Sequence, residues 1–356
     1  MASTLSDRGG PAPEVSPAEF VAGVRRRIDA RLEALLDEGA RYTGGVAPDA
    51  LPVLAAARDL TMRGGKRLRP AMLFAAIECV EPGAHPEAAA DLGAALELLQ
   101  TYLLIHDDWM DGDPVRRGAP SVHVLLERAF GDAHLGAATA ILAGDLMGSM
   151  VHNVVGLLDL PVARRREVLK VFGRMEHEVI LGQCLDVTRS PDIEKIHALK
   201  TGSYTVRGPL LLGAAVAGAS PEAVASLEAY AHPLGLAFQL RDDVLGAFGS
   251  AAETGKPVGG DFREGKETLL LQHARATLSA GDVTTLNGLV GKRDASEAEV
   301  LHVRELVAAS GAREVAEARI TELRGQCLSA LSAAAFHTRG RELLRAFATL
   351  LTDRSR

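Results

Sequence analysis

The sequence is poor in the residues that β-sheets and disulfide frameworks require. Aromatic residues make up 4% of the 356-residue chain, and its three cysteines, Cys79, Cys184 and Cys327, lie far apart. An odd number of scattered cysteines without a CxxC pair gives neither a disulfide framework nor a cysteine metal site, so we expect reduced, buried thiols. Scarce aromatic and β-branched residues disfavour an all-β fold, and abundant alanine and leucine favour helices.

Long hydrophobic runs and excess positive charge are also missing. No stretch approaches the roughly 18 charge-free apolar residues of a membrane span, and the most apolar segment, residues 209–219, is too short. The formal net charge of −7 argues against a nucleic-acid surface and against attraction to an anionic membrane. These absences predict a soluble, cytoplasmic protein with no nucleic-acid partner and no stable membrane insertion.

Helical periodicity organises almost the whole chain. Residues 1–18 are rich in Ser, Gly and Pro and lack an apolar h-region, which predicts a disordered leader rather than a signal peptide. Beyond it, apolar residues recur at helical spacing and no domain-sized linker occurs. The sequence therefore predicts an all-α fold, with one domain over residues 19–356 built as a single large helical bundle.

Three of the predicted helices are long enough to form the walls of a deep bundle. They span about 87–111, 134–158 and 222–246. Several glycines fall inside helical patterns, among them Gly182 and Gly213, where glycine is costly. We therefore expect close helix approach, or a wall lined by ligand, at these glycines.

Two acidic motifs end long apolar helices. In DDWMD, the spacing of Asp107 and Asp111 places both carboxylates on one helix face, with Asp108 to the side. A second pair, Asp242 and Asp243, follows another apolar run. Crowded carboxylates repel one another, and Mg²⁺ with its preference for oxygen ligands offsets that repulsion. A solvated helix end is the alternative for a single motif, and the second motif weakens that alternative.

Basic residues gather in short clusters rather than in one broad patch. They occur in RGGKRLRP (63–70), RRG (116–118) and KTG (200–202), and again at Lys256 and Lys266. Glycine permits a tight turn, the arginine fork matches phosphate oxygens, and lysine provides a point charge. Each cluster alone is typical of a solvated loop, but together with two acidic motifs they indicate a phosphate ligand.

With these motifs, the sequence resembles the trans-isoprenyl diphosphate synthases of the polyprenyl synthetase family. The similarity covers nearly the whole chain after about residue 20, and its motifs in order are GGKRLRP (64–70), DDWMD with RRG (107–118), GQCLD (182–186), KTG (200–202), FQLRDD (238–243) and GKPVGGDFREGKETL (255–269). Class I terpene cyclases share the fold and the first motif, but their second motif is an Asn/Ser/Glu triad, which is not found beside Asp242. The resemblance implies a bundle of the isoprenoid synthase type with a deep central cavity, and a homodimer.

The resemblance also implies two substrate sites, one for isopentenyl diphosphate and one for an allylic prenyl diphosphate. The first would be bound by Lys66, Arg69, Arg117 and Gln100, the last standing where the family usually has histidine. The allylic diphosphate would be neutralised by Arg116, Lys200, Lys256 and Lys266. Thr201 and Gln239 would flank the reacting carbons.

Metal ligands follow from the same resemblance. About three Mg²⁺ ions would be held by Asp107, Asp111 and Asp242, supported by Asp108 and Asp243. Gly246 occupies the position of a third aspartate in longer versions of the second motif, and we expect Asp261 to compensate for it.

The reaction implied is Mg²⁺-dependent ionisation of the allylic substrate, condensation and proton elimination. Chain length should depend on the helix preceding Asp107, through Leu99, Tyr102 and Leu103. A bulky ring at Tyr102, and no inserted pair of residues within DDWMD, predict a C20 product, geranylgeranyl diphosphate, with C15 farnesyl diphosphate as the alternative. A noncatalytic regulatory subunit is a second alternative, which the two intact acidic motifs disfavour.

Overall fold

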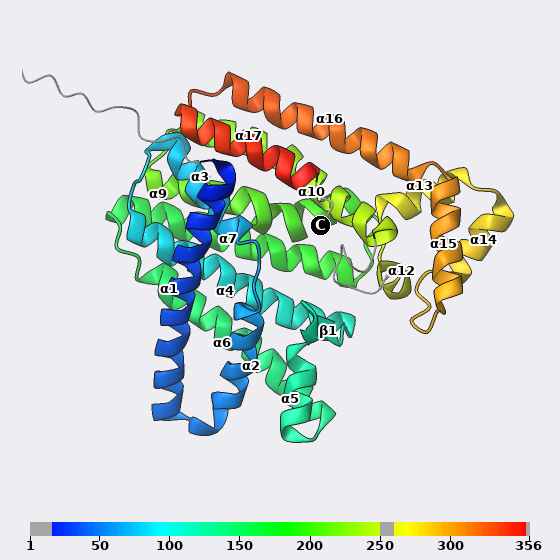
Figure 1. Cartoon of the computed structure of the whole chain (residues 1–356), viewed down its shortest axis with the longest axis horizontal. Coiled ribbons are helices and arrows are strands. Elements are labelled where there is room, and N and C mark those ends of the chain that lie inside the picture. The colour runs from blue at the N-terminus through cyan, green and yellow to red at the C-terminus, as the bar shows by residue number, and fades with distance from the viewer. Residues whose placement is uncertain (1–15, 250–259, 354–356) are drawn as a thin grey trace, which may run out of the picture.

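The computed structural model describes residues 16–249 and 260–353 (Figure 1). Long helices dominate it: α1 (Pro17–Val46), α4 (Pro86–Asp111), α6 (Ala133–Gly156), α7 (Val162–Val187), α10 (Pro221–Phe248) and α16 (Ala312–Ala333). Helices α4, α6 and α10 match the three predicted walls within two residues at each end. The predicted all-α fold is confirmed.

Shorter elements join these helices. They are η1 (Pro48–Ala50), α2 (Leu51–Met62), α3 (Leu68–Val80), α5 (Val122–Phe130), α8 (Ile193–Ile196), the π-helix η2 (His197–Arg207), α9 (Gly208–Ala217), α12 (Gly260–Glu264), α13 (Leu269–Thr277), α14 (Ala280–Leu289), α15 (Glu297–Ala309) and α17 (Thr338–Thr352). The two-residue strands β1 (Val115–Arg116) and β2 (Ala119–Pro120) form an antiparallel hairpin after α4.

Helix α1 begins earlier than the sequence predicted. Ser16 caps it through a capping box with Glu19, in which each side chain bonds the backbone N–H of the other, and Pro17 occupies the first turn. Residues 17 and 18 therefore belong to the helix rather than to the predicted leader. Residues 1–15 lie outside the described part of the chain.

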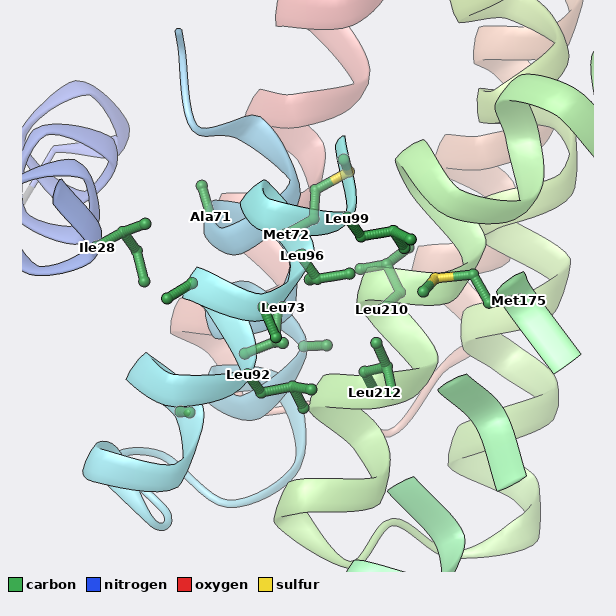
Figure 2. Packing of buried hydrophobic residues seen from close by; sticks show 14 of the residues in the cluster. Ile28, Ala71, Met72, Leu73, Leu92, Leu96, Leu99, Met175, Leu210 and Leu212 are labelled. Carbon is green, nitrogen blue, oxygen red and sulfur yellow. The ribbon is translucent and has the colours of Figure 1, made fainter. Parts of the chain in front are cut away.

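The main core lies between α3, α4, α7 and α9. Leu73 of α3, Leu96 and Leu99 of α4, Met175 of α7 and Leu210 of α9 pack together there (Figure 2). All five are 2% exposed or less. Helix α4 also packs against α6, while α10 packs against η2 and α16. This packing fixes the ends of α4 and α10, which carry the two acidic motifs.

Glycine allows two close helix approaches, as the sequence predicted. A Cβ at Gly213 of α9 would lie 2.2 Å from the backbone oxygen of Leu73 in α3. A Cβ at Gly182 of α7 would lie 2.2 Å from the backbone nitrogen of Lys200 in η2. Both glycines therefore let a neighbouring backbone come closer than any side chain would permit, and the second brings Lys200 beside α7.

Within the described residues, two helices, α4 and α6, are long and apolar enough to cross a membrane by length and composition alone. In the most apolar 18-residue stretch of α4, 72% is buried inside the protein, which is expected of a core helix. The corresponding stretch of α6 is only 39% buried. Helix α6 thus presents apolar side chains on the surface, of which Leu142 is 60% exposed.

Candidate active site

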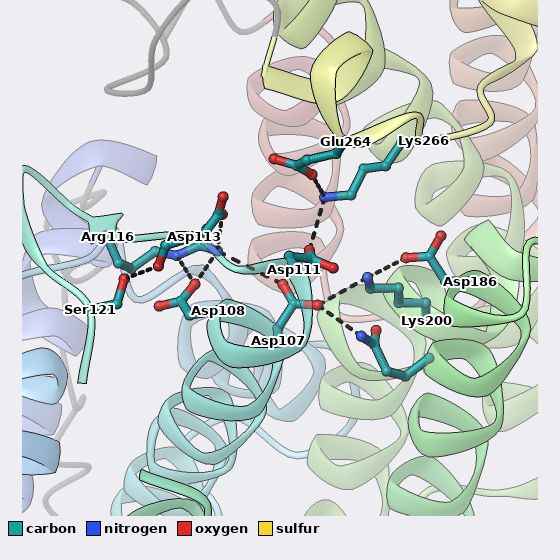
Figure 3. Close-up of polar contacts among 11 residues, drawn as sticks. Asp107, Asp108, Asp111, Asp113, Arg116, Ser121, Asp186, Lys200, Glu264 and Lys266 are labelled. Atoms are coloured by element: carbon teal, nitrogen blue, oxygen red, sulfur yellow. Dashed lines mark hydrogen bonds and ion pairs between the residues drawn. The ribbon is translucent and has the colours of Figure 1, made fainter. Parts of the chain in front are cut away.

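The first acidic motif lies on the last turn of α4, facing η2 and the segment after α12 (Figure 3). Gly112, with a φ of 71°, ends the helix in the left-handed region. The chain then turns into the β1–β2 hairpin, which returns Arg116 to the motif.

Asp107 is surrounded by donors from two other helices. Its Oδ1 accepts from Lys200 Nζ at 3.1 Å and from Gln183 Nε2 at 3.0 Å, and Lys200 also contacts Asp186 Oδ2 at 2.5 Å. Burial would raise the pKa of Asp107, but Lys200, Lys266 and Arg116 together hold it below its usual value. The carboxylate is therefore charged and paired with lysine.

Asp111 has a second lysine. Lys266 Nζ lies 3.2 Å from Asp111 Oδ2 and 2.8 Å from Glu264 Oε2. Burial raises the pKa of Asp111, and Lys266 opposes that shift. In Figure 3 the two ammonium groups approach the motif from above and from the side of η2.

Asp108 is fully buried and turns away from Lys200 toward Arg116. Arg116 Nε donates to Asp108 Oδ1 at 2.6 Å and Arg116 Nη2 to Asp113 Oδ2 at 3.2 Å, while Asp108 Oδ2 has no hydrogen-bond partner among the described residues. Burial raises the pKa of Asp108 to about 6. Arg116, which was predicted to neutralise the allylic diphosphate, lines the same cavity as Asp107 and Lys200, and these carboxylates hold its guanidinium there.

The second acidic motif lies on α10, with Asp243 buried behind Asp242. Gln239 Nε2 donates to Asp243 Oδ1 at 2.8 Å, and Gln239 Oε1 accepts from Thr201 Oγ1 at 2.7 Å. His197 Nε2 lies 3.4 Å from Asp243 Oδ2. Burial raises the pKa of Asp243 to about 7 and lowers that of His197 to about 4, so the imidazole is neutral.

Asp261 occupies the space next to Gly246. A Cβ at Gly246 would lie 2.2 Å from Asp261 Oδ2, so any larger residue would push this carboxylate away from its place beside the second motif. The expected compensation for the missing third aspartate thus has a structural counterpart, because α12 places its own aspartate at this position.

Three cavities meet at this site. One of about 420 Å³ is lined by both acidic motifs and by Lys200, Lys266 and Asp261. A basic cavity of about 320 Å³ is lined by Lys66, Arg69, Gln100, Arg117 and Tyr204 among others. An apolar cavity of about 230 Å³ lies between α4, α7 and η2. Thr201 lines all three.

Backbone contacts and an aromatic ring hold the basic cavity in shape. Arg69 Nη2 donates to Thr205 Oγ1 at 2.7 Å, and its guanidinium lies over the Tyr204 ring, 4.3 Å from the centroid. Arg117 donates to the carbonyl oxygens of Gly64 and Leu60. The structure thus brings together Lys66, Arg69, Gln100 and Arg117, as the resemblance implied.

The predicted chain-length residues divide between cavity and core. Tyr102 and Leu103 line the apolar cavity, whereas Leu99 is fully buried and does not line it. Tyr102 stacks edge-on against His106, whose Nε2 lies 2.9 Å from the Ile141 carbonyl oxygen. Lys256 lies outside the described residues.

The donor set fits a divalent cation that prefers oxygen. Among residues 16–249 and 260–353, no group of three or more His, Cys, Asp or Glu side chains is close enough to hold a metal ion. The carboxylates nevertheless converge from two helices, Asp108 keeps one buried oxygen without a hydrogen bond, and lysines supply the opposing positive charge. Hard oxygen donors of this kind suit Mg²⁺.

Several site residues were not predicted individually. Gln183 and Asp186 contact Asp107 and Lys200, and both belong to GQCLD, a motif that the resemblance had matched without assigning roles. Tyr204 and Thr205 lie one turn after KTG and reach the site because η2 is a π-helix. His197 has no signal in the sequence beyond its proximity to KTG.

Comparison with known proteins gives consistent matches. The family model described as Polyprenyl synthetase matches residues 52–307. The chain is 36% identical over 281 residues to a short chain isoprenyl diphosphate synthase of Methanothermobacter thermautotrophicus, covering 77% of this chain and 81% of that protein. It is 35% identical over 270 residues to a (2E,6E)-farnesyl diphosphate synthase of Mycobacterium tuberculosis, covering 73% and 72%.

A solved structure matches over almost its full length. The crystal structure of geranylgeranyl pyrophosphate synthase from Corynebacterium glutamicum, complexed with isoprenyl diphosphate and magnesium, superimposes with a TM-score of 0.88 at 34% identity. The match covers 95% of this chain and 99% of that one. The bundle described above is therefore of the isoprenoid synthase type.

Proposed function

Because the chain belongs to the polyprenyl synthetase family, we propose that it is a trans-prenyltransferase that joins isopentenyl diphosphate to an allylic prenyl diphosphate. The observation that supports this most directly is the junction at Thr201, where a basic cavity, a carboxylate-lined cavity and an apolar cavity meet. Two anionic substrates and one growing apolar chain require that combination.

Divalent metal belongs to this proposal. Asp107, Asp111 and Asp242, supported by Asp108 and Asp243, would hold about three Mg²⁺ ions, in agreement with the magnesium in the Corynebacterium glutamicum complex. When bound, the metal withdraws charge from the leaving diphosphate.

Cationic side chains of the protein bind and neutralise the two diphosphates. Lys200 and Lys266 lie in the carboxylate-lined cavity, where their ammonium groups neutralise the charge that develops on the allylic diphosphate as its C–O bond breaks. Lys66, Arg69 and Arg117 hold the diphosphate of isopentenyl diphosphate in the adjoining cavity. The two substrates thereby meet beside Thr201 and Gln239.

Condensation forms one carbon–carbon bond and releases one proton. The double bond of isopentenyl diphosphate attacks the allylic carbocation through C4, and a proton from C2 passes to an oxygen of the released diphosphate. The apolar cavity, walled by Tyr102, Leu103 and Val179, receives the prenyl tail and excludes water that would quench the cation.

We propose a C20 product. Tyr102 places a ring in the wall of the apolar cavity, where it restricts depth, while Leu103 beside it leaves more room than a second aromatic residue would. Relatives with C15 and C20 names both match this chain, so C15 is the competing product.

One assay tests the activity and its product. The purified protein is incubated with labelled isopentenyl diphosphate, Mg²⁺ and, in separate reactions, dimethylallyl, geranyl or farnesyl diphosphate, and the product length is determined. Elongation to C20 supports the proposal, and accumulation of C15 corrects the length. No condensation with any primer would contradict the activity and favour the noncatalytic subunit.

The functional unit we propose is a homodimer formed through α6 and α7. Leu142 of α6 is 60% exposed, and Leu169 and Ile180 of α7 are 46% and 42% exposed. A surface with this many large apolar side chains on two neighbouring helices favours association with a second copy.

A further inference from the structure

Arg67 of the GGKRLRP motif has a guanidinium that is almost completely buried. It is 3% exposed, and each of its three guanidinium nitrogens donates to a protein oxygen. Nε donates to Asp29 Oδ1 at 2.8 Å, Nη1 to Glu97 Oε2 at 2.7 Å, and Nη2 to the Thr61 carbonyl oxygen at 3.1 Å. Arg67 also lines the basic cavity, but its fork is already engaged by protein oxygens, which leaves it poorly placed for a bidentate contact with a phosphate.

These acceptors come from three different helices. Asp29 belongs to α1, Thr61 to the end of α2 and Glu97 to α4, while Arg67 is the residue before α3. Arg67 therefore ties four helices together at the position where the chain passes from α2 to α3.

The segment it holds is conformationally demanding. Gly64, Gly65 and Arg67 have φ angles of 97°, 150° and 51°, and the last is unfavourable for a residue with a side chain. Such a conformation persists only where its surroundings impose it. This same segment carries Lys66 and leads into Arg69, both of which line the basic cavity.

Glu97 of α4 accepts one of the hydrogen bonds from Arg67 and also faces the basic cavity. It is 3% exposed and keeps Oε1 without a hydrogen-bond partner among the described residues. An unpaired buried carboxylate would repel a diphosphate bound in this cavity. The Glu97 charge is instead paired with the buried Arg67 guanidinium, and the two charges compensate each other inside the protein.

We propose that the triad of Arg67, Glu97 and Asp29, of which the first two are buried, positions Lys66 and Arg69 for isopentenyl diphosphate. The triad acts through these two residues, and it leaves the carboxylate-lined cavity around Asp107 unaffected. The inference rests on the proposed function, since it assumes that the basic cavity holds isopentenyl diphosphate.

The test is Arg67→Lys, which keeps the charge but loses the planar fork. We expect the KM for isopentenyl diphosphate to rise about tenfold or more, with kcat and the KM for the allylic substrate changed by less than about threefold. Glu97→Gln should shift the same KM in the same direction by a smaller factor. Arg31→Lys is the matched control, because Arg31 pairs with Asp91 between the same helices α1 and α4 but away from this segment.

A readout without substrate separates positioning from stability. Amide hydrogen exchange of residues 63–69 should quicken in Arg67→Lys and stay unchanged in Arg31→Lys, at a temperature well below both melting points. A lower melting temperature with unchanged exchange and unchanged KM would overturn the proposal, and so would equal increases in both KM values. If the wild type shows no condensation, the proposed function is wrong, while the exchange rates still decide whether Arg67 orders this segment.

Discussion

At the scale of single residues, the active-site carboxylates are distinguished by their partners. Asp107 and Asp111 form ion pairs with lysines, and Asp108 forms one with Arg116. Asp243 accepts a hydrogen bond from Gln239. The burial that raises the pKa of Asp108 and Asp243 acts on Asp107 as well, but there Lys200, Lys266 and Arg116 together outweigh it. Asp107 is thus the carboxylate that stays charged most reliably.

A first prediction concerns Asp107. The change Asp107→Asn removes a charged oxygen donor and the partner of Lys200, so kcat should fall by about 10²- to 10³-fold. Steady-state kinetics measure the fall, and circular dichroism should show an unchanged helix content. The control is Asp145→Asn, an α6 carboxylate that is 59% exposed, which should retain kcat. Near-normal turnover in Asp107→Asn would contradict the role assigned to this carboxylate, and treatment of the wild type with EDTA should abolish activity in parallel.

A second prediction concerns the thiols. Burial raises the pKa of Cys79 and of Cys327 to about 12, whereas Cys184 is exposed. Native protein at pH 8 should therefore take up thiol reagent at Cys184 alone, and all three cysteines should react in urea. Mass spectrometry of the labelled peptides identifies the sites. Rapid native labelling of Cys327 would show that the packing of α16 against α10 opens more readily than this burial implies.

At the scale of secondary-structure elements, we expect glycine to lower the stability of the protein in one helix and to raise it in another. A Cβ at Gly325 in α16 would have no atom of the described residues within 4 Å, whereas a Cβ at Gly213 in α9 would meet the Leu73 carbonyl oxygen. We expect Gly325→Ala to raise the free energy of unfolding by ~0.5–1 kcal/mol and Gly213→Ala to lower it by ~1–3 kcal/mol. Chemical denaturation measures both. Equal effects in the two variants would contradict the close approach of α9 to α3.

We expect helix α4 to set the depth of the apolar cavity. Tyr102 lies five residues before Asp107, about 7.5 Å along the helix axis, and it lines the cavity. We expect Tyr102→Ala to shift the product toward C25 and longer chains, which chromatography of the dephosphorylated products would reveal. Leu99→Val, which alters a core residue outside the lining, is the control. An unchanged product distribution in Tyr102→Ala would place the floor elsewhere, for example on α6.

At the scale of the whole molecule, the exposed face of α6 and α7 predicts association. Leu142→Glu should convert the dimer that we propose into a monomer, because it places a charge among apolar side chains at the contact. Light scattering coupled to gel filtration measures the mass. Leu301→Glu, at a residue of α15 that is 54% exposed, should leave the mass unchanged. A monomeric wild type would contradict the proposed assembly.

The sequence predicted most of this architecture, for reasons that particular residues make plain. Helical periodicity located α4, α6 and α10, because each buries a regular apolar stripe. The motif residues Lys66, Arg69 and Arg117 came together as the resemblance implied. The capping of α1 by Ser16 has a local signal, because Ser16 and Glu19 have capping-box spacing and Pro17 follows the cap, and this signal places the helix start ahead of the expected boundary. The π-helical segment that places Tyr204 against Arg69 has no comparable local pattern.

Other features depended on contacts between distant segments. Arg67 and Arg69 are two residues apart in one basic motif and both line the basic cavity. Arg67 is nevertheless paired with Asp29 and Glu97, whereas Arg69 donates to Thr205. Asp261 reaches Gly246 only because α12 folds back on α10. Arg116 lines the carboxylate-lined cavity, and its contacts with Asp108 and Asp113 depend on the hairpin after α4, which no local pattern predicts.

The pairing of Lys200 with Asp107, and of Lys266 with Asp111, makes the two ligands of this site interdependent. A phosphate that draws an ammonium group away leaves its aspartate more available to a cation, and a cation bound to the aspartate likewise leaves the ammonium group more available to a phosphate. Binding of the diphosphate therefore weakens the lysine–aspartate pair that competes with the cation, and binding of the cation weakens the pair that competes with the diphosphate. This coupling between two different ligands is heterotropic cooperativity. Thermodynamic reciprocity then requires that a diphosphate tighten cation binding by the same factor by which the cation tightens diphosphate binding, a factor that calorimetric titrations in either order should give alike.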